Sequence, residues 1–165
     1  PRVPELDAAG EPLWEPHKIF DANFDGSEPL LVPRPLYMRP SVIFVAKLGL
    51  YGLAFGSGDR EDLWLGTQQE GRFYVFVDDT DFLAEGSLPL TEQNLAPVEV
   101  TAAEVDVDYL LERPSGQRGW YIPLEEAERV ITEAFALSGV TFFSTYQPDV
   151  VVSGDRDPLI CQRRP

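Results

Sequence analysis

Residues 72–78, RFYVFVD, decide the fold class, because aromatic and β-branched residues follow one another as they do in a buried strand. Two more runs of this kind, residues 41–46 and 50–55, are separated by three residues that end in Gly49, which is typical of a hairpin loop. GWYI at 119–122 and GVTFFST at 139–145 predict two further strands. We therefore expect an all-β chain.

The segment between the last two strands fits both a helix and a strand. Leu124, Ala127 and Ile131 fall near helical spacing, so spacing alone favours a helix. The β-branched run at 130–132 favours a strand. Elsewhere, Thr91 ahead of Glu92 predicts one short helical turn.

Composition excludes several functions. The 165 residues are enough for one domain, and 28 acidic against 13 basic residues give a formal charge of -15. Such a charge repels phosphate backbones, so nucleic acid is not an expected partner. The apolar runs are far shorter than the roughly 20 residues that cross a bilayer, so we expect no membrane-spanning segment.

Proline divides the chain. Residues 1–41 hold eight of the 15 prolines, a density that forbids a continuous helix or a central strand. We expect residues 1–41 to be a connecting segment and residues 42–165 to carry the β structure.

Four segments in a fixed order resemble the C-terminal β-propeller of the PilY family, exported proteins at the tip of type IV pili. Their sequences are LAFGSGDREDLW at 53–64, RFYVFVDD at 72–79, LPLTEQNL at 88–95 and GWYIPLEEAERVITEAFALSGVTFFSTYQP at 119–148. Each segment alone is a weak signal, but the succession over about 95 residues is specific, since context is what confirms a motif.

The resemblance implies a fold and resolves the ambiguous segment. A propeller has typically four to eight blades of four strands, so 165 residues supply only part of the ring, and we expect a fragment of a larger ring built from antiparallel hairpins with long loops. The family pattern places a turn at 124–128 and a strand from about Arg129 onward. A cysteine follows the last strand in the family as Cys161 does here, and its partner is left open.

The resemblance also implies a function. We expect a non-enzymatic segment of an exported pilus-tip adhesin that supports adhesion and the assembly or regulation of type IV pili. Its expected partners are the remaining propeller segments, minor pilins or the pilus tip, and a host or abiotic surface. The expected location is extracellular or at the cell surface. The alternative is a fragment of a periplasmic quinoprotein-type propeller dehydrogenase, which would need a cofactor on the ring axis.

One stretch, residues 21–28 or DANFDGSE, resembles the start of a calcium loop. Asp21, Asn23 and Asp25 place oxygen ligands at positions one, three and five, and a glycine stands at position six. Position twelve is Val32 instead of glutamate, so a calcium site here would be weak. The competing interpretation is that these side chains only cap a turn.

The remaining candidate residues give no catalytic assignment. Asp59 and Arg60 could bind a polar ligand or could cap and pair within a turn. The acidic group at 78, 79 and 81 could bind a cation or form a solvated rim. Aromatic side chains could form a binding platform, although we expect most of them in the core. His17, the single histidine, excludes multi-histidine metal sites and triads that depend on histidine.

Overall fold

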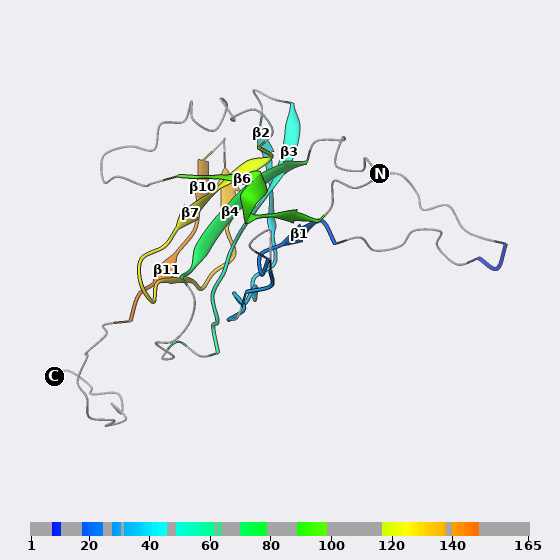
Figure 1. Cartoon of the computed structure of the whole chain (residues 1–165). Helices are drawn as coiled ribbons and strands as arrows, with labels where there is room; N and C mark the ends of the chain where they lie inside the picture. The colour runs from blue at the N-terminus through cyan, green and yellow to red at the C-terminus, as the bar shows by residue number, and fades with distance from the viewer. Residues whose placement is uncertain are drawn as a thin grey trace.

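The computed structural model is an all-β molecule (Figure 1). It describes residues 8–10, 18–24, 28–30, 32–45, 49–61, 63, 70–78, 89–98, 117–137 and 140–148.

A five-stranded sheet forms the centre of the molecule, with the strand order β2-β3-β4-β7-β6. Its strands are β2 (Ser41–Val45), β3 (Leu50–Gly56), β4 (Arg72–Asp78), β7 (Gly119–Pro123) and β6 (Leu95–Pro97). The first four pair antiparallel, and β6 runs parallel to β7. Gly49 has a φ of 66° at the β2–β3 turn, a conformation that glycine adopts without strain. The predicted hairpin and the predicted strands at 72–78 and 119–122 are confirmed.

Short strand pairs flank this sheet. β1 (Phe20–Asp21) runs parallel to β5 (Leu90–Thr91), and the 3₁₀ turn η2 (Glu92–Asn94) follows β5 at once. Thr91 is the N-cap of this turn, which confirms the short helical turn predicted there. The other two pairs are antiparallel: β8 (Arg129–Val130) with β11 (Thr145–Tyr146), and β9 (Phe135–Leu137) with β10 (Val140–Phe142).

Each face of the central sheet carries its own hydrophobic cluster, because side chains alternate between the faces along a strand. The first cluster lies under Phe20 of β1 and comprises Ala22, Phe55, Tyr74, Phe76, Leu90 and Leu95. The second lies under the chain from 124 to 143 and comprises Ala54, Phe73, Val75, Leu124, Val130 and Ala134. The sheet is thus covered on both sides over β3, β4 and β7.

The ambiguous segment between β7 and β9 is a turn followed by a strand. Glu128 N donates to Glu125 O at 3.0 Å, Ala127 has a φ of 60°, and β8 begins at Arg129. The prediction of a turn at 124–128 with a strand from Arg129 is confirmed, although β8 is only two residues long.

The single strand predicted at 139–145 is wrong, since the structure has two strands there. Phe143 and Ser144 lie between β10 and β11. The ring of Phe143 stacks on Phe73, with centroids 3.8 Å apart, and the chain changes its pairing partner from β9 to β8 at this point. Burial of one aromatic ring therefore outweighs continuity of the strand.

The proline-rich segment contributes β1 and a buried Arg34 to the fold. The division of the chain near residue 41 stays a prediction. Among the described residues, no helix has the length and hydropathy that a transmembrane span requires.

Candidate functional site

The Gly-Ser-Gly turn at 56–58 joins three separate parts of the chain. Ser57 N donates to Arg72 O at 2.8 Å, and Arg72 N donates to Ser57 Oγ, also at 2.8 Å. Val130 N donates to Ser57 O, and Gly58 N donates to Pro35 O. A Cβ atom at position 56 would overlap the side chain of Val130, so only glycine lets β8 approach this closely. The turn therefore connects β3, β4, β8 and the proline-rich segment.

Arg34 enters the molecule beside this turn. Its side chain is 8% exposed although it lies between two prolines of the N-terminal segment. Its guanidinium donates to Glu92 Oε2 at 2.6 Å, to the backbone oxygen of Ala22 at 3.2 Å and to that of Glu70 at 3.1 Å. A buried arginine needs such partners, because an uncompensated charge is costly inside a protein.

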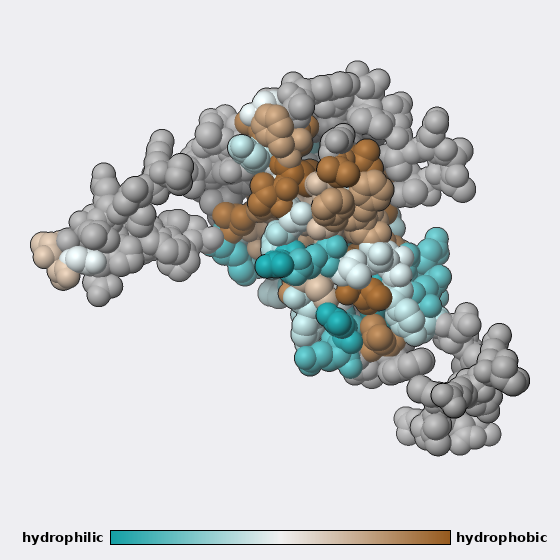
Figure 2. Space-filling model, turned by 180° about the vertical axis from the view of Figure 1, so that it is seen from behind, coloured by the Kyte–Doolittle hydropathy of each residue, from teal (hydrophilic) through white to brown (hydrophobic). Residues whose placement is uncertain are grey.

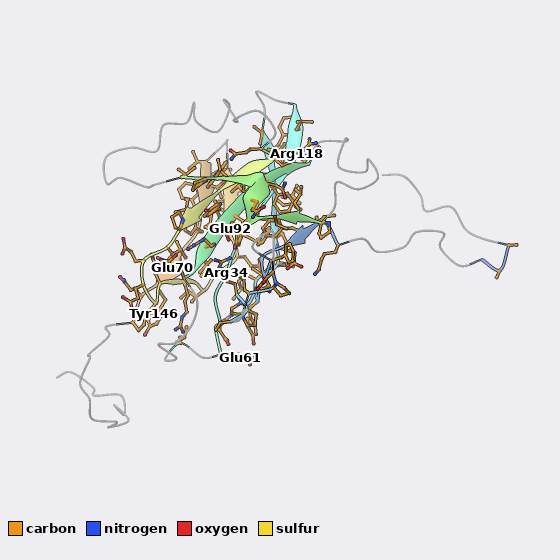
Figure 3. The ribbon with its side chains drawn as sticks, in the orientation of Figure 1. Arg34, Glu61, Glu70, Glu92, Arg118 and Tyr146 are labelled. Carbon is orange, nitrogen blue, oxygen red and sulfur yellow. The ribbon has the colours of Figure 1, made fainter. Side chains whose placement is uncertain are left out.

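Glu92 is shared by two arginines. Its Oε2 accepts from Arg34 Nη1 and its Oε1 accepts from Arg72 Nε at 3.1 Å. Tyr74 Oη donates to Glu92 Oε2 at 3.3 Å. Asn94 Oδ1 accepts from Thr91 N at 2.8 Å and fixes the 3₁₀ turn that presents Glu92. We call this group, with Glu70, the Arg34–Glu92 cluster, and Figure 3 shows Arg34, Glu92 and Glu70 together beside β4.

Arg72 completes the cluster at its outer end. Its Nη1 lies 2.8 Å from Glu70 Oε2, and its guanidinium carbon lies 5.5 Å from the ring centroid of Tyr121. Burial lowers the pKa of Arg72, but the hydrogen bonds to Glu70 and Glu92 outweigh burial, so the pKa is raised. Arg72 stays charged.

The two tyrosines of the cluster stay neutral. Burial, together with the Glu92 carboxylate, raises the pKa of Tyr74 far above its ordinary value and outweighs the opposing effect of the arginines. Burial and the same carboxylate also raise the pKa of Tyr121. The cluster therefore holds two positive and two negative side chains, with neutral phenols around them. Such an arrangement fixes the N-terminal segment to the sheet and is suited to holding structure rather than to moving protons.

A second feature is an exposed apolar surface. Seven large apolar side chains of four strands are between 52% and 63% exposed. We call them the apolar strand surface, and they are Val42, Phe44, Tyr51, Phe135, Leu137, Val140 and Phe142. Figure 2 shows hydrophobic residues gathered over the upper part of the molecule, where β2 and β10 lie in Figure 1.

The predicted calcium residues are placed in part. Asp21 Oδ2 accepts from Lys18 Nζ at 2.7 Å and Oδ1 accepts from Asn23 N at 3.0 Å. The hydrogen bond from Lys18 lowers the pKa of Asp21, against a smaller effect of burial. Asn23 Oδ1 accepts from Arg34 N. Among the described residues, no group of three or more His, Cys, Asp or Glu side chains is arranged to hold a metal ion. Asp25 lies outside them, so the calcium site stays a prediction.

Other sequence candidates behave as ordinary turn and core residues where they are described. Asp59 Oδ1 accepts from Glu61 N at 2.8 Å, as a turn-capping aspartate does. Trp120 packs against Phe73 in the second core cluster. The candidates outside the described residues are His17, Asp79, Asp81, Cys161 and the other two tryptophans, Trp14 and Trp64.

The sequence analysis missed both main features. Arg34 and Glu92 are 58 residues apart, and nothing local to either residue predicts the pair. The apolar strand surface did have a signal. SVIFV in β2 is apolar at every position after the first serine, which predicts burial on both faces, and one of these faces is open.

Together these features define a class, an all-β segment with a firmly closed core and one open apolar end. The fold is that of part of a solved domain, the C-terminal domain of PilY1 from Pseudomonas aeruginosa, with a TM-score of 0.57 and 22% sequence identity. The match covers 84% of this chain and 32% of the solved chain. The expected fold class, all-β and part of a propeller, is thereby confirmed.

The other comparisons gave nothing. A scan against models of protein families and a search of curated protein sequences each found no match.

Proposed function

We propose that this chain is a propeller segment of an exported PilY-type pilus-tip protein, which supports adhesion and the assembly or regulation of type IV pili. The observation that carries the proposal is the shared fold with the PilY1 C-terminal domain over 84% of the chain. The order of the four sequence motifs supports the same family independently. The chain spans about a third of the solved domain, so the partners and the activity of a whole protein belong to the proposal.

In this proposal the segment does no chemistry. Its partners are the remaining propeller segments, minor pilins or the pilus tip, and a host or abiotic surface, and its location is the cell surface. Calcium bound near Asp21 would be an accessory ligand. A coloured, redox-active cofactor that co-purifies with the protein would favour a quinoprotein-type dehydrogenase instead and would overturn the proposal.

An in-frame deletion of the codons for residues 1–165 in the source bacterium tests the function. We expect fewer surface pili and weaker attachment, both restored by the wild-type gene. A second strain carries Glu133→Gln, which alters only an exposed ion pair with Arg39, and it should behave as the wild type. Normal piliation and attachment in the deletion strain would contradict the proposal.

A further inference from the structure

The apolar strand surface is the open end of a core that is covered elsewhere. Phe44 faces Tyr51 across the β2–β3 pair, and Val42 faces Leu53. Partners in register share a face, so these side chains continue the face that carries Phe55, Tyr74 and Phe76. Phe20 covers that face over β3 and β4, with ring centroids within 5.8 Å of all three. Towards β2 the exposed fraction rises above one half.

The β9–β10 hairpin extends the same surface. Phe135 faces Phe142, and Leu137 faces Val140, so all four side chains project from one face of the hairpin. Each of them is more than half exposed. β9 lies against β2, which makes the hairpin and the sheet end neighbours. Figure 2 shows their hydrophobic surfaces in one view.

The size and the charge of this surface fit a specific contact. Four rings and three aliphatic side chains, each about half exposed, present on the order of 700 Å², close to the roughly 800 Å² that each partner gives to a standard interface. The strands β2, β3, β9 and β10 contain no Asp, Glu, Lys or Arg, in a chain where a quarter of the residues are charged.

We propose that the apolar strand surface packs against another β-sheet of the same, longer polypeptide. This inference rests on the proposed function and names the partner surface. Two observations favour that occupant over a second copy of this chain. The solved domain with this fold is about three times as long as the part that matches, and two copies would each bring a charge of -15 to the contact. Apolar sheet faces packed face to face exclude water as the two layers of a sandwich do.

Thiol labelling distinguishes the occupants. Phe44→Cys and Phe142→Cys are placed one at a time in a Cys161→Ser background, which removes the native thiol. Tyr37→Cys is the matched control, because Tyr37 is 51% exposed against 54% and 55% for the two test positions. Tyr51→Cys serves as a second sheet position if one variant folds poorly, and circular dichroism checks the fold of each. A maleimide is added to the isolated 165-residue chain and to the full-length protein of the gene.

We expect the three positions to react at similar rates in the isolated chain. In the full-length protein, the two test positions should react on the order of tenfold more slowly, with Tyr37→Cys unchanged. Equal rates in both proteins would overturn the inference. Protection in the isolated chain that grows with protein concentration would identify a second copy as the occupant and would also overturn it. The assay involves no pili, so loss of the pilus function alone leaves its outcome intact.

Discussion

The Arg34–Glu92 cluster gives the most specific stability prediction, and its perturbation is Glu92→Gln. The glutamine keeps the shape of the side chain but removes the carboxylate shared by Arg34 and Arg72, whose own side chains are 8% and 11% exposed. Two nearly buried guanidinium groups then lose their common counter-charge. Breaking a buried ion pair costs about 3 to 5 kcal/mol, and because Glu92 is itself 16% exposed we expect about 3 kcal/mol.

The control for this prediction is the ion pair of Arg39 with Glu133. Its side chains are 79% and 49% exposed, and the two atoms lie 2.8 Å apart, a distance similar to those in the cluster. Glu133→Gln should cost about 0.5 kcal/mol or less, since exposed pairs are screened by water.

Urea denaturation followed by circular dichroism measures both free energies of unfolding. If Glu92→Gln lowered the free energy of unfolding by no more than Glu133→Gln does, the cluster would not be what holds residues 18–40 to the sheet. Equal effects would refute the reasoning from burial, because the two pairs differ mainly in exposure.

Three further predictions concern the core, the turn and calcium. The raised pKa of Tyr74 stabilises the fold below the ordinary tyrosine pKa and is lost as the pH rises through the folded value, so the melting temperature should fall above about pH 10, and less steeply in Tyr74→Phe. An equal fall in both proteins would contradict this. Gly56→Ala should cost about 1 to 3 kcal/mol by overlap with Val130, and part of this cost should disappear in the double variant with Val130→Ala; additive costs would exclude the overlap. Calorimetry with calcium should show weak binding that Asp21→Ala with Asp25→Ala abolishes, and identical titrations would leave only a turn.

Local patterns predicted the strands of the central sheet because their signals lie within each segment. RFYVFVD in β4 and the Gly49 turn between β2 and β3 follow from residue type and backbone geometry alone. The split between β10 and β11 could not be predicted in this way. It depends on Phe143 stacking on Phe73, a contact across 70 positions of sequence.

The candidate site was harder to predict than the fold for the same reason. Arg34 looks like a solvated residue of a proline-rich segment, and its burial follows only from Glu92 and the backbone oxygens of Ala22 and Glu70. The exposure of Phe44 and Phe142 conflicts with the strand pattern for the opposite reason, because the pattern anticipates a cover that the described residues do not supply.

The most direct test of the central claim is the location of the protein. Pili are sheared from the source bacterium, purified and probed with an antibody raised against this 165-residue chain. The account predicts that the protein is found in the sheared pilus fraction and that this signal is lost in a strain that makes no type IV pili. A protein confined to the cytosolic fraction, with none in the pilus fraction, would contradict it.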